Sequence, residues 1–441
     1  MAPSALPLAP RPELTEPGLS GGIISSRGDF QDPLGWLVCF VSFSMLLLIS
    51  WSASRPGQWT TTIVVLLFLA PWGWIFLRQP ADALRGLIAN WPLTLLPLLA
   101  LVSTLWSDYP ATSLRAGAQY LLTIVIGIWA GYCIKPRFVT SALFSALLLV
   151  ALLSILDGTR QYDPYTGQYT LIGLFGSKNY FALCCSLLLL TASVVALDRS
   201  QGAIFRILGI AGVIAATPLL VYARSVGALI VSIAALFASL LLRLVIRLTV
   251  RSRIFLLVPV MLFALLAILI ASFDINYVNV LNSLGKDVTL TGRTLLWQYA
   301  TAAISKRPFL GGGYEAYWQP GNWSAIQLWV YSYVTDRYGY HFHNTYLEIG
   351  VDLGFLGMTV FVITLLAIMF RIVAAFCLEL LQSEQIWSIT IFIFLFLRTP
   401  IEVDLFFQFQ IASILFCLIW IYLRPAKARR PERLVPKRAD V

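Results

Sequence analysis

Apolar runs long enough to cross a lipid bilayer recur along most of this 441-residue chain. A hydrocarbon core about 30 Å thick is crossed by roughly 20 residues of α-helix, and about twelve runs approach that length. Hydrophobic residues make up 59% of the chain and charged residues 12%, which excludes a soluble domain. We therefore predict an all-α polytopic membrane protein. The predicted helices lie near 34–50, 60–77, 91–106, 115–134, 138–156, 178–197, 203–222, 225–242, 254–272, 344–370, 386–399 and 405–423.

Lysine and arginine are distributed unevenly between the two sides of these predicted helices. When loops are assigned alternately from the amino terminus, most of the 31 Lys and Arg residues fall on the side that holds both termini. Basic loops are retained in the cytoplasm during insertion, so both termini are predicted to be cytoplasmic. Residues 34–423 then form the transmembrane domain, after a disordered Pro-, Ser- and Gly-rich tail, 1–33. The basic tail 424–441 is predicted to lie near anionic lipid rather than to bind nucleic acid.

The basic residues on the opposite, outer side carry more information because translocating a cation opposes the topology rule. Several lie in one long predicted loop, 273–343, and Arg224 interrupts "PLLVYARSVGALIV" between two apolar runs. Snorkelling to the interface would explain Arg224, but an ion at membrane depth more often faces a cavity or a partner. The other cations at predicted outer helix mouths are Arg115, Lys178 and Arg398.

The loop 273–343 contains a helical pattern of its own. In "TLTGRTLLWQYATAAISKRPFLGGGYEAYW", apolar residues recur at helical spacing, Thr291 can cap the start, and Pro308 follows the end. We predict a short amphipathic helix that covers the outer helix mouths. Arg293 falls in its first turn, where the helix dipole disfavours a cation unless an anion binds there.

Both histidines of the chain lie in "HFHNTYLEIG", residues 341–350. His343 and Asn344 open the next predicted membrane helix, on which Asn344, Glu348 and Asp352 recur every four residues and share one face. Carboxylates entering a membrane helix are costly unless they line a polar cavity, so a cavity is expected along this face.

A metal-dependent site is an alternative at the outer end of the chain's last helices. In "RTPIEVDLFF", Glu402 and Asp404 are spaced to hold a divalent cation against a diphosphate, or else to pair with Arg398 or favour the dipole of the last helix. The six cysteines lie within or at the ends of apolar runs, so they predict neither a disulfide framework nor a zinc site. We predict no metal and no cofactor.

Five motifs, in this order, resemble the O-antigen ligase and exopolysaccharide polymerase family of bacterial membrane proteins. They are "WSDYPATSLR" (106–115), "GLFGSKNYFA" (173–182), "YARSVGALI" (222–230), "GRTLLWQYATAAISKRPFLGGGYEAYW" (292–318) and "HFHNTYLEIGVDLGFLG" (341–357). The resemblance covers roughly residues 100 to 420. Gly-Arg-x-x-x-Trp followed by His-Asn-x-x-Leu is its most specific part.

The resemblance implies a GT-C-like glycosyltransferase in the bacterial inner membrane. Its donor would be a saccharide on a polyprenyl diphosphate, its acceptor a glycan or lipid-linked glycan, and its active site periplasmic. Other polysaccharide-assembly proteins would be further partners. The family's catalytic positions match Arg224, Arg293 and His343, and its lysine-asparagine pair matches Lys178 and Asn179. This chain departs in "ARSVG", which lacks the usual Ser before Arg, and in "GSKN", which has Ser where His is frequent.

The chemistry of such a transfer suits these residue types independently. Arginine grips phosphate oxygens of a departing diphosphate, and histidine accepts the proton of the attacking hydroxyl, with His341 as an alternative to His343. The most favoured function is polymerisation of exopolysaccharide or O-antigen repeat units. The alternatives are transfer of finished glycan to the lipid A core and, from a different class, transport of a lipid-linked saccharide. Substrate binding is assigned to Lys178, Asn179, Asn344, Arg115 and Arg398.

Overall fold

The computed structural model describes residues 32–53, 58–163, 167–253, 255, 293–334, 340–378 and 381–424. Almost all of the predicted tails 1–33 and 424–441, the predicted helix 254–272, the loop start 273–292 and the Thr291 cap lie outside these residues. The helices of the first half are α1 (Asp32–Ala53), α2 (Gln58–Arg78), α3 (Pro80–Ala89), η1 (Trp91–Thr94), α4 (Leu95–Val102), η2 (Ser103–Leu105), α5 (Pro110–Cys133), α6 (Pro136–Asp157), α7 (Lys178–Leu197) and α8 (Ala203–Tyr222). The later helices are α9 (Val226–Val245), α12 (Arg293–Lys306), α13 (Trp323–Tyr331), α14 (Thr345–Leu378), α15 (Ser383–Arg398) and α16 (Ile411–Tyr422).

The polytopic membrane architecture is confirmed. Within the described ranges, seven helices are long and apolar enough to cross a bilayer, or eight if the pair Pro80–Ala89 and Trp91–Leu105, bent by 79°, counts as one span. The total of about twelve spans is not confirmed. Apolar runs do not reveal bends or short helices, and both occur here: α16 has only 12 residues, all of them buried.

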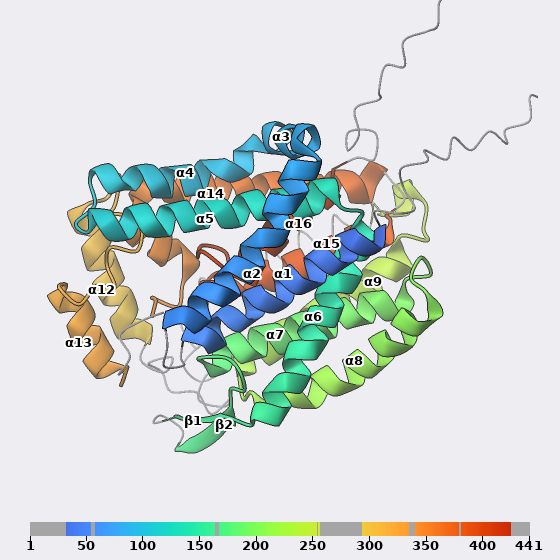
Figure 1. Ribbon diagram of the computed structural model, residues 1–441, viewed down its shortest axis with the longest axis horizontal. Helices are drawn as coiled ribbons and strands as arrows, with labels where there is room; N and C mark the ends of the chain where they lie inside the picture. Colours follow the sequence, from blue (N-terminus) through green and yellow to red (C-terminus); the bar gives the residue numbers. More distant parts are fainter. Residues whose placement is uncertain are drawn as a thin grey trace, which may run out of the picture.

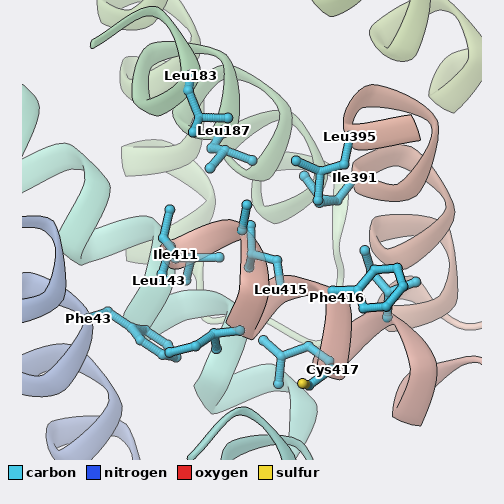
Figure 2. Packing of buried hydrophobic residues seen from close by; sticks show 14 of the residues in the cluster. Phe43, Leu143, Leu183, Leu187, Ile391, Leu395, Ile411, Leu415, Phe416 and Cys417 are labelled. Atoms are coloured by element: carbon cyan, nitrogen blue, oxygen red, sulfur yellow. The ribbon is translucent and has the colours of Figure 1, made fainter. Parts of the chain in front are cut away.

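Helix α16 lies in the centre of the bundle. Around Ile411 and Leu415 of α16, Figure 2 shows Phe43 of α1, Leu143 of α6, and Leu183 and Leu187 of α7. On the α5 side, a Cβ at Gly127 would lie 2.9 Å from the Cβ of Cys417, so only glycine allows this close approach. All six cysteines are free, and Cys39, Cys184, Cys185 and Cys417 are buried as small core residues.

A short β-hairpin interrupts the predicted all-α fold. Strands β1 (Arg160–Asp163) and β2 (Gln168–Leu171) pair antiparallel between α6 and α7, with Tyr162 opposite Tyr169. The sequence reading missed it because four-residue strands carry too few alternations to stand out beside apolar helical runs.

A helix is present within the predicted loop 273–343, as α12, which ends at Lys306, two residues before Pro308. In Figure 1, α12 and α13 lie together at one end of the bundle, beside the ends of α4, α5 and α14. Helix α14 breaks at Gly354, where φ is 63° and ψ is −162°. This break leaves backbone groups of α14 free to bind the loop.

The glycine-rich segment 310–314 fills the break in α14. Gly312 N–H donates to the carbonyl of Val351 (2.8 Å), and Gly313 N–H donates to that of Asp352 (2.9 Å). At Gly311, φ is 69° and a Cβ would lie 2.4 Å from the carbonyl carbon of Asp352, so glycine is required there. The outer loop is therefore docked on α14 through its backbone.

The motif 106–115 holds the other side of the same loop. Trp106 Nε1 donates to the carbonyl of Leu310 (2.9 Å), Asp108 N–H to that of Gly312 (3.2 Å), and Ser113 Oγ to that of Tyr314 (2.7 Å). The loop is thus fixed between the start of α5 and α14, which positions α12 and its Arg293.

Candidate active site

Three residues predicted from the sequence meet at one buried carboxylate, that of Glu402. Arg293 Nη2 lies 2.7 Å from Glu402 Oε1, and Asn179 Nδ2 donates to the same oxygen at 2.9 Å. His343 Nδ1 lies 3.0 Å from Glu402 Oε2. Burial alone would raise the pKa of Glu402, but the neighbouring charges of His343 and Arg293 hold that pKa well below its usual range. Glu402 is therefore an anion that organises the cluster.

The backbone around Glu402 is fixed by the same neighbours. Arg293 Nη1 donates to the carbonyl of Ile401 (2.6 Å), and Thr345 Oγ1 donates to that of Glu402 (2.7 Å). Thr345 N–H donates to the carbonyl of Thr399 (2.8 Å). Helices α12 and α14 are thus bound to the segment between α15 and α16.

His343 adopts a backbone conformation that is rare for a residue with a side chain. Its φ is 52°, in the left-handed region, and strain of this kind is concentrated at functional sites. Beside the anionic Glu402, Nδ1 of the imidazole is the donor, and the neutral form of the ring presents Nε2 as the acceptor. A carboxylate that orients a histidine in this way is the arrangement of a general base.

His341 is less suited to proton transfer. Its Nδ1 accepts the backbone N–H of His343 (3.1 Å), and the two rings lie 4.3 Å apart between centroids. Burial and the nearby charge of His343 lower the pKa of His341 to about 3. His341 is therefore neutral near pH 7, and one of its two ring nitrogens is already committed.

Arg224 lies beside the cluster with an exposed side chain. Its φ of 50° is also left-handed, and the hydroxyl of the next residue, Ser225, donates to Asn179 Oδ1 (3.4 Å). In the described part of the chain, the Arg224 guanidinium forms no hydrogen bond or ion pair. This exposed cation, next in the chain to a residue that contacts Asn179, is available to bind a ligand.

Four helices begin at this cluster, all with their amino-terminal ends toward it. Lys178 is the first residue of α7, Arg293 of α12 and Thr345 of α14, and α9 begins directly after Ser225. Helix amino termini carry partial positive charge and free N–H groups, which favour phosphate and other anions. Lys178, Arg224 and Arg293 carry three positive charges against the one negative charge of Glu402, so the net charge at these helix starts favours anions.

The structure gives no hydrogen bond or ion pair between the Glu402 carboxylate and the other three predicted substrate-binding residues, Asn344, Arg398 and Arg115, in the described part of the chain. Asn344 Oδ1 accepts the N–H groups of Tyr346 (3.0 Å) and Leu347 (3.1 Å), so this residue caps α14. Arg398 is 2% exposed and bonds Asp404 through Nε (2.6 Å) and Nη2 (3.2 Å). Arg115 is exposed on α5. Burial raises the pKa of Glu315, and the positive charge of Arg115 opposes part of this rise.

In the structure, the two carboxylates proposed as metal ligands are already paired with arginines. The Arg398 pair commits Asp404, so Glu402 and Asp404 do not face a shared ion position. Ligand atoms of His341, His343 and Glu402 lie within 4.8 Å of one another and could hold an ion geometrically. Arg293, however, already compensates the Glu402 carboxylate at 2.7 Å.

The carboxylate stripe of α14 has a different role from the one expected. Glu348 accepts hydrogen bonds from Trp318 Nε1 (2.9 Å) and from Phe342 N–H (2.7 Å), and Asp352 accepts one from Glu315 N–H (2.9 Å). Both side chains are buried. They bind the segment 315–318 and the backbone of Phe342, just before His343, rather than line a cavity.

Sequence reasoning missed the central position of Glu402 and the supporting Thr345 and Ser225. The sequence offers Glu402 as a metal ligand, a partner of Arg398 or a dipole partner, but not as the common partner of Arg293, His343 and Asn179. Its partners lie 223, 109 and 59 residues away in the chain. No local pattern signals contacts of that range.

Two comparisons with known proteins show which sequences this chain resembles. A sequence model described as O-antigen ligase matches residues 210–362, which include Arg224, Arg293 and His343. The chain is also similar to the "Exopolysaccharide production protein ExoQ" of Rhizobium meliloti (strain 1021). The two are 32% identical over 337 residues, which cover 76% of each protein.

Proposed function

Because this chain belongs to the O-antigen ligase and exopolysaccharide polymerase family, we propose that it moves saccharide units from a polyprenyl-diphosphate donor to a glycan acceptor. Polymerisation of repeat units is the function we favour, since the relative of known role is an exopolysaccharide production protein. Transfer of a finished glycan to the lipid A core is the alternative, and the O-antigen ligase match favours it.

One observation supports the donor class above all others. Four helices begin near Glu402, and Lys178, Arg224 and Arg293 lie at or just before three of these helix starts. In the proposed reaction, the bond between the sugar and the diphosphate breaks and leaves negative charge on the departing phosphate. Arginine forks and helix amino termini stabilise this charge as it develops.

His343 supplies the second half of the proposed chemistry. The acceptor hydroxyl attacks the sugar carbon, and Nε2 of His343 takes its proton, while Glu402 holds the ring through Nδ1. Arg293 and Asn179 keep Glu402 in place. We assign no metal to this mechanism.

Arg224→Lys tests the diphosphate clamp. Lysine keeps the charge but loses the planar fork, so we expect transfer to fall about tenfold or more with unchanged expression. The backbone cost of the left-handed φ is similar for both side chains. Turnover is measured with purified protein and lipid-linked donor. Arg247→Lys, an exposed position beyond the other end of α9, is the matched control and should retain full rate. Full activity of Arg224→Lys would exclude a bidentate contact.

The site is proposed to face the periplasm of the inner membrane, with both chain termini cytoplasmic. A cysteine at the exposed Thr301 position of α12 should then react with an impermeant thiol reagent added to intact spheroplasts. A cysteine at exposed Arg199, in the turn between α7 and α8, should react only after lysis. The reverse pattern would invert the topology. The parent chain reports the background of its six native cysteines.

Deletion of the gene separates polymerase from ligase. Loss of a polymerase leaves single repeat units, whereas loss of a ligase leaves full-length glycan that is not attached to lipid A core. Electrophoresis of the surface glycan before and after mild acid release distinguishes glycan length from attachment. Unchanged glycan in both measurements would contradict the proposed function.

A further inference from the structure

The β-hairpin between α6 and α7 has a feature that the proposed chemistry does not use. Tyr162 and Tyr169 face each other across the two strands, with ring centroids 5.4 Å apart, and are 52% and 64% exposed. Side chains alternate along a strand, so Arg160 shares their face, while the buried Thr170 points the other way, toward the protein. The tyrosine pair is therefore on the outward face of the hairpin.

The base of the hairpin is rigid and continuous with the active site. Ile172 and Gly173 N–H groups donate to the carbonyl of Thr159 (3.0 and 3.1 Å), and Ser154 Oγ accepts the N–H of Leu174 (3.3 Å). A Cβ on Gly173, whose φ is 55°, would lie 2.3 Å from that of Ser154. The chain then reaches Lys178 of the anion cluster within a few residues.

The composition of this face differs from that of the lipid-facing surface. Helix α8 exposes aliphatic side chains, such as Ile204 (73%) and Ile214 (68%). The described exposed side chains on the tyrosine face of the hairpin are instead Arg160, Tyr162 and Tyr169, that is, two aromatic rings beside a guanidinium group. Hydrocarbon does not suit such a surface, whereas a saccharide does. The C–H face of a pyranose packs on the electron-rich face of an aromatic ring, and its hydroxyls bond a guanidinium group and the phenol hydroxyls of tyrosine.

We propose that Tyr162 and Tyr169 form a subsite for the glycan chain, outside the reacting centre. This inference rests on the proposed transferase function, because each transfer lengthens a chain that must leave the cluster along the outer surface. The subsite would hold sugar residues beyond the first repeat unit. It would raise affinity for long chains without entering the chemical step.

The test compares wild type with the double variant Tyr162→Val, Tyr169→Val. Valine keeps strand propensity and cross-strand packing but removes the ring faces. The probes are fluorescently labelled oligosaccharides of one and four repeat units, prepared from the native polysaccharide. We expect the variant to bind the four-unit probe about tenfold more weakly and the one-unit probe equally well. In a transfer assay, its products should be shorter, with an unchanged rate on the one-unit acceptor.

Two controls keep the outcomes separate. Tyr331→Leu, on α13, replaces another exposed tyrosine and should bind both probes as wild type does. Thermal unfolding of the double variant checks that the fold is retained. If wild type shows transfer but the double variant binds the four-unit probe with wild-type affinity, the subsite is excluded, and the pair is a hairpin or headgroup contact. If wild type shows no transfer with any donor, the proposed function itself fails.

Discussion

Replacing His343 by asparagine is expected to lower saccharide transfer by about two to four orders of magnitude, the usual contribution of a general base. Asparagine is the sharper choice than alanine because it tolerates the left-handed backbone at this position, where φ is 52°. Its amide can still donate to Glu402, but it cannot take a proton. The expected loss therefore belongs to chemistry rather than to folding.

The measurement is single-turnover transfer with purified protein and lipid-linked donor, beside a donor-binding assay. Donor affinity should change little, because Arg224, Arg293 and the helix amino termini remain. His341→Asn is the matched control and should cost far less, since His341 is neutral near pH 7 and uses Nδ1 to accept the N–H of His343. If His343→Asn keeps wild-type turnover, the base lies elsewhere, and Glu348 and Asp404 become the candidates.

Several site residues could be predicted from the sequence because each is energetically unfavourable in its local sequence context. Arg293 places a cation in the first turn of a helix, and Arg224 interrupts an apolar stretch. Both features cost free energy unless a ligand or partner compensates them. The structure brings Arg293 together with His343 and Asn179 at Glu402.

Other roles could not be read locally. Asn344 belongs to the most specific motif, yet its side chain caps α14, a role that asparagine fills at many helix starts. Arg398 was assigned to substrate but is paired with Asp404, which the sequence offered only as one of several alternatives. In both cases, the residue type suits two roles, and only the tertiary partner decides between them.

The fold shows the same division between local and long-range information. Helix positions followed from apolar runs, whereas the break at Gly354 depends on the glycine segment 311–313 that fills it. The sequence shows the glycines at 311–313 and at 354, but it does not show that these two segments are in contact. The hairpin likewise takes its stability from Ser154 and Thr159 on the preceding helix end and turn.

Glu402→Gln is expected to reduce both transfer and stability, because one carboxylate serves Arg293, His343 and Asn179. The amide keeps the volume but removes the charge. It leaves Arg293, whose side chain is 18% exposed, without an anionic partner. Hydrogen bonds to charged groups contribute about 1.5–3 kcal/mol each, so the free energy of unfolding should fall by about that amount or more. Transfer should fall about a hundredfold, because the base loses its orienting anion.

The pH dependence of stability tests whether the destabilisation of Glu402→Gln comes from loss of the carboxylate charge. The pKa of Glu402 is held well below its ordinary value of 4.5 in the folded protein. Its contribution is therefore complete above that value and is lost as pH falls toward the folded-state pKa. Thermal unfolding in detergent between about pH 3 and pH 7 should show this acid-dependent loss in wild type and a smaller loss in Glu402→Gln.

A second ion pair supplies the control for this experiment. Asp404, two residues after Glu402, forms a buried ion pair with Arg398, and Asp404→Asn breaks this pair and should also destabilise the protein. It leaves the Glu402 contacts to His343 in place, so the turnover of the folded fraction should stay within a few fold of wild type. Adding Arg293→Met to Glu402→Gln removes the uncompensated cation and should restore part of the stability but none of the activity. Equal turnover losses in Asp404→Asn and Glu402→Gln would mean that Glu402 acts only through the fold.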